Sequence, residues 1–368
     1  MASRYLEDVL AEPLRLQELL TRLTRAPLAE TVAQGAEQLR AAACPWIAGM
    51  GSSYHGGLAL QALCDAAGRP ARNGDAGELL HFAPLPPRGT LLLLSRSGRS
   101  VEVVELLQKA RAAQSTTIAV TNDPDSPLAR GAGTSVLLGA PFDFNVSVLM
   151  YSGVALAGAL LVAQSLQRWR PEWAAELQRA LQDAQRRLPA WQAAIASSSF
   201  VAAESTTLLL ARGAGLAAAN EARQLWEEAA KHPATALSTA AFRHGPNEVV
   251  APGCRVVLWL ATTERLREFD LALAADLRRA GAKVALVGRD LPSGVADLAL
   301  ELPATPPGFA FLVELMPVRL LAEAVARARR IDCDTFRYCP FVVASEAGLG
   351  DGHGAGGGGS SGGGSAPA

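Results

Sequence analysis

A serine-rich turn, Ser95-Arg96-Ser97-Gly98-Arg99-Ser100, joins an expected strand at 91–94 to an expected helix at 99–114. Phosphate binds well at such a place, because hydroxyls, arginines and the free N–H groups of a helix N-terminus all favour an anion. Gly98 would let a ligand approach the backbone closely. A turn whose serines only cap the helix is the alternative. The residue types favour a phosphate site.

A second small-residue loop, Gly49-Met50-Gly51-Ser52-Ser53, follows an expected strand at 45–50. Its first two glycines fit the G-x-G-x-x-G fingerprint of a dinucleotide site, but Tyr54 stands where the third glycine belongs. The mismatch argues against a nicotinamide site. The hydroxyls of Ser52 and Ser53 favour contact with a sugar phosphate, and a plain tight turn is the alternative.

Three glutamates, Glu221, Glu227 and Glu228, lie on an expected helix at 220–231, and His244 follows in the run 242–246. A carboxylate and an imidazole together can move a proton between adjacent carbons and open a sugar ring, since both can be tuned to titrate near the working pH. Glu227 fits a solvated helix face equally well. His244, before Gly-Pro, also fits a structural turn.

Alternating strands and helices predict an α/β fold of two similar halves, each a doubly wound parallel sheet flanked by helices. Pairing Gly51 with Gly213 and Gly89 with Gly253 gives nearly equal offsets of 162 and 164 residues, which indicates a duplication. Ligands of such sheets bind beyond the carboxyl ends of the strands, where the motifs above fall. The expected strands are 45–50, 91–94, 116–120, 207–210, 256–260 and 283–287.

The chain divides into five expected segments. Helices are expected over 1–43, the first subdomain over 44–165, a helical linker over 166–200 and the second subdomain over 201–346. The Gly/Ser-rich stretch 347–368 cannot bury enough apolar surface to order itself, so a disordered tail is expected there.

The composition of the chain excludes some classes of partner and indicates a cellular compartment. The net charge of −1, from 34 basic and 35 acidic residues, lacks the cationic field that nucleic acids require. The five scattered cysteines contain no C-x-x-C pair, so no metal site is expected, and with no signal peptide pattern a cytoplasmic protein is predicted. The uncharged run 146–165 is interrupted by serine and glycine, which favours a buried core or interface helix over a membrane span.

Taken in order, the motifs resemble the sugar isomerase (SIS) domain family, in particular the tandem isomerase half of glucosamine-6-phosphate synthase and the related amino-sugar-phosphate deaminases and deglycases. The loop at 49–55 is similar to the family's G-C-G-T-S-Y-H, and the serine turn is similar to S-x-S-G-E-T. The stretch 211–228 is similar to G-R-G followed by the E-G-A-L-K-L-K-E helix, and 242–246 contains the H-G-P motif. The resemblance covers about residues 5 to 346.

The resemblance implies a dimer of two-subdomain chains that binds a phosphosugar without a metal or organic cofactor. Glu228 would be the base that shuttles a proton between C1 and C2. His244 would assist ring opening, and in the family this residue can come from the partner subunit. Substrate contacts would come from Ser52, Ser53, Ser95, Arg96, Ser97, Gly98, Ser100 and Glu221. The expected activity is isomerisation or deamination of an amino-sugar or amine-linked hexose 6-phosphate, and a non-catalytic phosphosugar-binding or regulatory protein is the alternative.

Four positions depart from the family pattern. Ala2 stands where the synthases carry the nucleophilic cysteine of their glutaminase domain, so an enzyme without that domain is expected. Leu225 replaces the first lysine of the glutamate helix, and Phe341 falls on the position of the tail lysine. Arg99 replaces the glutamate after S-x-S-G, which would add a cation near the phosphate or sugar.

Overall fold

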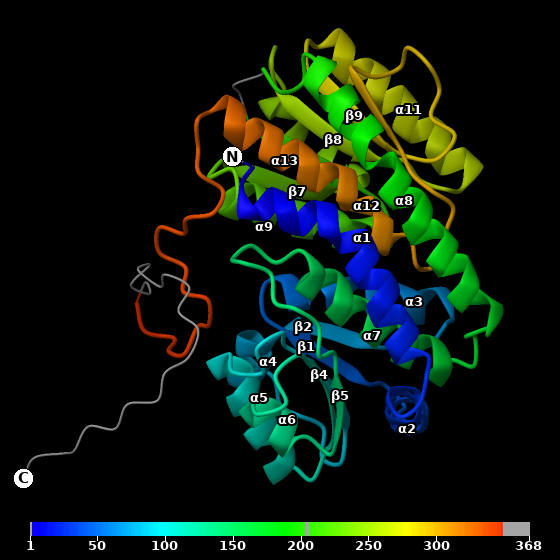
Figure 1. The fold of residues 1–368 in the computed structure, drawn as a ribbon, viewed down its shortest axis with the longest axis vertical. Helices are drawn as coiled ribbons and strands as arrows, with labels where there is room; N and C mark the ends of the chain where they lie inside the picture. The colour runs from blue at the N-terminus through cyan, green and yellow to red at the C-terminus, as the bar shows by residue number, and fades with distance from the viewer. Residues whose placement is uncertain (1, 203–205, 349–368) are drawn as a thin grey trace, which may run out of the picture.

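The computed structural model describes residues 2–202 and 206–348, and it contains two five-stranded parallel sheets (Figure 1). The first sheet has the order β2-β1-β3-β4-β5 and the second β10-β9-β8-β6-β7. When the strands of each half are counted along the chain, both sheets have the second strand at one edge, followed by the first, third, fourth and fifth. The two halves therefore share one topology. The α/β fold with two doubly wound parallel sheets is confirmed.

The first sheet packs helices on both faces. Leu92 and Leu94 of β3 face one core with α3, while Leu91 and Leu93 face another with α5, as the period-2 alternation of a strand requires. Both sets are buried, so the strand is apolar throughout. The elements of this half are β1 (Trp46–Gly49), α3 (Ser52–Ala66), β2 (Arg72–Asp75), α4 (Ala76–Phe82), β3 (Thr90–Leu94), α5 (Val101–Ala112), β4 (Thr116–Thr121), α6 (Pro127–Gly131) and β5 (Thr134–Leu137).

The second sheet repeats this arrangement. Leu209 and Val257 face the inner core, and Leu208 and Val256 face the outer one, which α11 covers. Its elements are β6 (Thr207–Ala211), α9 (Gly215–Glu228), β7 (Ala234–Ser238), α10 (Thr239–Phe242), the short 3-10 helix η1 (Pro246–Val249), β8 (Arg255–Trp259), α11 (Glu264–Arg279), β9 (Lys283–Gly288) and β10 (Leu298–Glu301).

A layer of helices between the sheets joins them through one continuous core. The layer includes α1, whose N-terminus is capped by the Ser3 side chain, and α7, which is buried on all sides and shows no polar face. In Figure 1, α1 and α13 lie side by side between the two sheets. The remaining helices are α1 (Arg4–Leu23), α2 (Leu28–Ala41), α7 (Leu149–Ser165), α8 (Glu172–Ser197), α12 (Phe311–Glu314) and α13 (Met316–Ala328).

A fully buried ion pair in this layer joins two helices that lie far apart in the sequence. Glu12 of α1 accepts a hydrogen bond from Nη1 of Arg319 in α13. The Ser152 hydroxyl of α7 donates to the same carboxylate at 2.6 Å. Nη2 of Arg319 donates to the Val148 carbonyl at 3.1 Å. These contacts offset part of the cost of burying the two charges, while Glu12 Oε2 and Arg319 Nε have no hydrogen-bond partner among the described residues.

The chain after α13 returns to the first sheet. In Figure 1 this orange-red segment leaves the second half and runs along the side of the molecule toward the first. The Val343 carbonyl accepts a hydrogen bond from the Val101 amide at 3.2 Å, and Glu346 contacts His81 of α4 at 3.1 Å. The C-terminal segment thus lies against the first residues of α5.

Several sequence expectations needed correction in detail. The expected helices at 99–114 and 220–231 are Val101–Ala112 and Gly215–Glu228, and the linker helix begins only at Glu172. The sequence analysis did not predict the edge strands β2, β5, β7 and β10, which are short and partly exposed. The proposed subdomain boundaries remain predictions, and the expected disordered tail lies, from residue 349 on, outside the described residues.

The uncharged run at 146–165 forms α7, which is buried as expected. Within 2–202 and 206–348, no helix is long and apolar enough to cross a bilayer.

Candidate active site

The candidate site lies where the first sheet reverses its strand order. The connection from β1 leads to β2 on one side, whereas β3 and the later strands lie on the other side, so a ligand is expected between the loops at the carboxyl ends of β1 and β3. The β1 end leads into Gly51 and α3, and the β3 end leads into the serine turn. The two hydroxyl-rich motifs of the sequence therefore stand on neighbouring strands.

The serine turn is organised by its own hydroxyls. Ser95 Oγ accepts a hydrogen bond from the Gly98 amide at 3.1 Å, and Ser97 Oγ accepts one from the Arg99 amide at 3.2 Å. Because each oxygen accepts from the backbone, its hydrogen stays available to donate to a ligand. Ser100 precedes α5 without capping it through its side chain.

Three of the amides expected to be free at this turn are engaged. The amides of Gly98 and Arg99 donate to the serine hydroxyls, and the Val101 amide donates to the Val343 carbonyl. A phosphate at this turn would rely on the hydroxyls and the remaining donors, or would displace the Val343 carbonyl.

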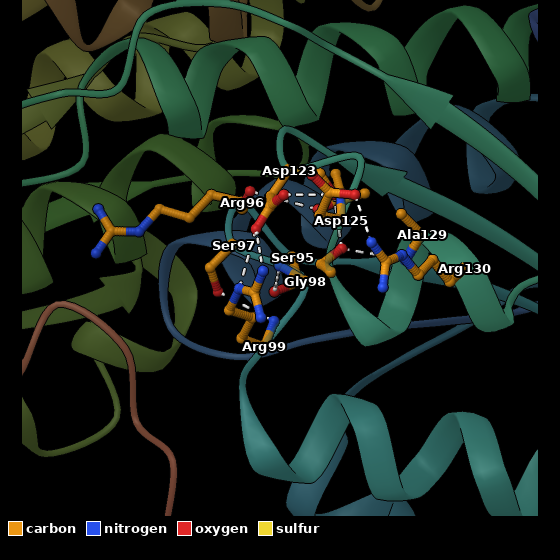
Figure 2. Close-up of polar contacts among 11 residues, drawn as sticks. Ser95, Arg96, Ser97, Gly98, Arg99, Asp123, Asp125, Ala129 and Arg130 are labelled. Carbon is orange, nitrogen blue, oxygen red and sulfur yellow. Dashed lines mark hydrogen bonds and ion pairs between the residues drawn. The ribbon is translucent and has the colours of Figure 1, made fainter. Parts of the chain in front are cut away.

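Arg99 also differs from the expectation of an added cation near the phosphate. Figure 2 shows its guanidinium turned to Asp123 after β4, with Nε at 2.9 Å and Nη2 at 2.7 Å from the same carboxylate oxygen. Burial raises the pKa of Asp123, but the Arg99 hydrogen bond and the Asp125 amide outweigh that effect and hold the pKa below its ordinary value. The ion pair neutralises Arg99 and fixes the turn to the next loop.

Ser52 and Ser53 begin α3 directly after the carboxyl end of β1. Gly51, which precedes them, has φ +50 and no side chain, and an added Cβ would lie 3.0 Å from Nε2 of Gln224. The loop of the first half therefore packs directly on α9 of the second half. Both serines are half-buried, at the junction of the two halves.

Glu228 is the last residue of α9 and is half-buried. Nε2 of Gln224 donates a hydrogen bond to Glu228 Oε1 at 2.7 Å. Burial raises the pKa of Glu228 above its ordinary value, the Gln224 hydrogen bond opposes the rise, Glu221 adds to it, and the positive charge of Arg96 lowers it. The pKa of this carboxylate is thus shifted upward, the direction that favours proton transfer by a general base or acid.

Glu221, two turns before Glu228 on α9, is buried against α3. Its Oε2 lies 2.9 Å from His55 Nδ1, and the two side chains are 2% and 4% exposed. The pair holds the helices of the two halves together. Its contribution to substrate binding stays a prediction, as do the roles of the other site residues.

His244 stands apart from Glu228. It lies in the exposed stretch 243–249 after α10, and among the described residues its side chain makes no hydrogen bond or ion pair. Within one chain, no hydrogen bond or ion pair joins Glu228 and His244 among the described residues. We therefore expect His244 to act in the site of the partner subunit.

Arg96 and Phe341 meet at the edge of the site. The guanidinium lies 4.2 Å from the centre of the Phe341 ring, and Nη2 donates to the Phe341 carbonyl at 2.8 Å. The tail segment therefore reaches the serine turn, and an aromatic ring stands at the position of the family's tail lysine. Leu225, the other replaced lysine, is buried in the core.

No group of three or more metal-ligating side chains occurs in the described part of the chain.

Comparison with known proteins identifies the first half. Residues 46–161 match the SIS domain family. They form a SIS domain. They include β1 to β5 and most of α7, so both serine loops lie within the SIS domain.

Two curated relatives show how far the similarity extends beyond the SIS domain. A glutamine-fructose-6-phosphate aminotransferase of Mycolicibacterium smegmatis is 24% identical over 81% of this chain and 50% of its own length. The enzyme of the same name from Symbiobacterium thermophilum is 28% identical over 89% of this chain and 57% of its own. The chain spans about half the length of the curated relatives it matches.

Solved structures show the same fold over nearly the whole chain. The C-terminal domain of glucosamine-fructose-6-phosphate aminotransferase from Francisella tularensis gives a TM-score of 0.78 at 19% identity, covering 91% of this chain and 98% of that one. A glucosamine-6-phosphate deaminase from Thermotoga maritima gives 0.78 at 18% identity, covering 93% and 99%. The resemblance found in the sequence is thus confirmed.

Sequence reasoning missed three residues that organise the site, namely Gln224, His55 and Asp123. Gln224 lies four residues before Glu228, a spacing that places both on one helix face, so the helical period could have found it. His55 and Asp123 pair with residues far away in the chain, and no local pattern marks such partners.

Proposed function

We propose that this protein isomerises or deaminates an amino-sugar or amine-linked hexose 6-phosphate by proton transfer at Glu228. The observation that carries the proposal is the half-buried Glu228 carboxylate, hydrogen-bonded by Gln224 and acted on by the charge of Arg96 from the serine turn. A general base would thus act opposite a phosphate-binding loop that belongs to the other half of the chain. The matched aminotransferases and the deaminase support this chemistry by their names.

The phosphate would bind at the carboxyl ends of β1 and β3. Hydroxyls of Ser95, Ser97 and Ser100 would donate to its oxygens, and Ser52 and Ser53 would hold the sugar from the facing loop. The Ser95 and Ser97 oxygens already accept backbone hydrogen bonds, which fixes their orientation before the ligand arrives. Such preorganisation lowers the cost of binding.

Glu228 would take a proton from one of two adjacent carbons and return it to the other through an enediolate or enolamine. For glucosamine 6-phosphate, the resulting imine takes up one water and releases ammonia, which leaves fructose 6-phosphate. His244 would transfer the ring-opening proton from the partner subunit, since within one chain it contacts no site residue. The proposal therefore includes a homodimer, and places the protein in the cytoplasm with no nucleic-acid or membrane partner.

A non-catalytic phosphosugar-binding protein is the second candidate. The Val343 carbonyl on the Val101 amide and the Phe341 ring on Arg96 favour it, because the tail presents no lysine there and covers part of the turn. A binder would need the serines but not the Glu228 base, so retention of Glu228 beside Gln224 favours the enzyme.

The deciding experiment measures ammonia and fructose 6-phosphate formed from glucosamine 6-phosphate by the wild-type protein and by Glu228→Gln. Product that depends on Glu228 supports the enzyme. No product, together with thermal stabilisation of both proteins by the same ligand, supports the binding protein. Glu227→Gln is the matched control, because Glu227 is exposed and paired with Arg223 at 2.6 Å.

A further inference from the structure

The buried pair of His55 and Glu221 joins the two halves beside the candidate site. Nδ1 of His55 on α3 lies 2.9 Å from Oε2 of Glu221 on α9, and both side chains are buried. An ionised carboxylate only accepts hydrogen bonds, so Nδ1 carries the shared hydrogen. Among the residues that the structure describes, no other side-chain hydrogen bond joins α3 to α9. The pair is therefore a specific polar link between these two helices.

In the first half, His55 is fixed to the loop that begins α3. Its amide donates to the Gly51 carbonyl at 3.0 Å, and the Ser53 amide donates to the Met50 carbonyl at 3.0 Å. These bonds form the first turn of the helix, in which Ser52 and Ser53 lie. A displacement of His55 would therefore move the hydroxyls that are proposed to hold the sugar.

In the second half, Glu221 lies on the same face of α9 as the proposed base. Positions 221, 224 and 228 are separated by three and four residues, a spacing that places them along one side of a helix. Gln224 donates to Glu228 Oε1 at 2.7 Å and also lies against Gly51 of the first half. The face of α9 that presents Glu228 is thus the face that meets α3.

Stability does not explain why a titratable pair is buried at this junction. Taking two such groups out of water is costly, and an apolar pair of similar volume often gives equal or greater stability. The best-attested use of buried polar groups is to fix the register of packed elements. This site needs such a register, because the loop proposed to hold the sugar and the proposed base belong to different halves.

Resting on the proposed function, we propose that His55 is a positioning residue, which holds Glu228 at the reacting carbons through its hydrogen bond to Glu221. The pair aligns α9 on α3, so that a sugar held by Ser52 and Ser53 meets the base in a reactive geometry. A misplacement of about 1 Å can lower a rate by about 100-fold. Loss of the hydrogen bond should therefore reduce turnover far more than ligand binding.

The test compares His55→Leu, which removes the hydrogen bond, with His55→Asn, whose amide keeps an N–H donor near the place of Nδ1. Turnover of glucosamine 6-phosphate gives kcat, and isothermal titration gives the dissociation constant of fructose 6-phosphate. Leu60→Ala is the control for stability. Leu60 is fully buried on the same helix and packs on Gly158 of α7, so its truncation destabilises α3 by a cavity while leaving the pair intact.

In His55→Leu, kcat should fall by about 10- to 100-fold, while the dissociation constant changes by no more than about threefold. His55→Asn should recover most of the lost turnover, and folded Leu60→Ala should keep the wild-type kcat. A wild-type kcat in His55→Leu, or an equal fall in Leu60→Ala, overturns the positioning role and leaves the proposed function standing.

Hydrogen exchange separates a failure of this inference from a failure of the proposed function. Fructose 6-phosphate should slow exchange in the last turn of α9 strongly in the wild-type protein and weakly in His55→Leu. If the wild-type protein binds the sugar but forms no product, the proposed catalysis fails, and equal protection of α9 in both proteins overturns the role of His55. If the sugar does not bind the wild-type protein, both proposals fail.

Discussion

Gln224 Nε2 donates to Glu228 Oε1 at 2.7 Å along one turn of α9, and the same amide lies against Gly51 of the opposite half. The hydrogen bond fixes one oxygen of the proposed base and leaves the other open. It therefore links the position of the base to the loop that leads into Ser52.

Replacing Gln224 by leucine should move the acid limb of the pH profile upward. The hydrogen bond stabilises the charged carboxylate and opposes the rise in its pKa, so its loss raises the pKa of Glu228 further. The base would then be protonated at a higher pH than in the wild-type protein. The measurement is kcat/KM against pH, with a direct NMR titration of the carboxyl. An unshifted limb in Gln224→Leu would remove Gln224 from the positioning role; Arg223→Gln is the control on the exposed face.

Gly98→Ala should disrupt the serine turn. A Cβ there would lie 2.2 Å from Ser126 Oγ, and the residue has φ +62. Gly68→Ala is a close control, since Gly68 has φ +67 but nothing within 4 Å. Both substitutions carry the strain of a positive φ, about 1 kcal/mol, and Gly98→Ala should lose at least that much again together with phosphosugar binding. Urea denaturation and ligand-induced thermal shifts test this, and equal losses in the two variants would contradict it.

Breaking the Glu12–Arg319 pair should destabilise the whole fold. Both side chains are fully buried, so Arg319→Met leaves a buried carboxylate without its cation and should cost about 3–5 kcal/mol. Adding Glu12→Gln to that variant should recover part of the loss. Arg130→Met, which breaks the exposed pair with Asp125, should cost less than about 1 kcal/mol. An Arg319→Met protein as stable as wild type would show that the pair is dispensable.

Glu314 should make stability depend on pH. Burial raises the pKa of Glu314 to about 7, and its Oε2 has no hydrogen-bond partner among the described residues. The folded state therefore keeps a proton that the unfolded chain releases above about pH 4.5, so this contribution is full at low pH and is lost as the pH rises to about 7.

Glu314→Gln should thus be the more stable protein at pH 8, by roughly 1–3 kcal/mol, and should lose this part of the pH dependence. The measurement is the free energy of unfolding in urea at pH 5 and pH 8. A wild-type advantage at pH 8 would contradict the assignment. Glu227→Gln, at an exposed pair, should leave the pH dependence unchanged.

The sequence allowed the strands with strong apolar runs to be predicted, because β3 and β8 are buried on both faces and must be apolar throughout. The edge strands could not be predicted in the same way, since β2 reads Arg-Asn-Gly-Asp and takes its conformation from pairing with β1. In the site, residue types marked the serine turn, but the engagement of the Val101 amide depends on Val343, far away in the chain. The chemistry of a local motif could therefore be predicted from the sequence, whereas contacts between residues far apart in the chain could not.

The helix α1 gains its native partners in two stages along the chain. It packs against α2, α7 and α8, but its Glu12 pairs with Arg319, which lies 307 residues further along the chain. Until α13 has been synthesised, the Glu12 carboxylate lacks its cation, and burying it would be costly. A nascent chain that stops before α13 would therefore expose this part of the helical layer to chaperones and proteases.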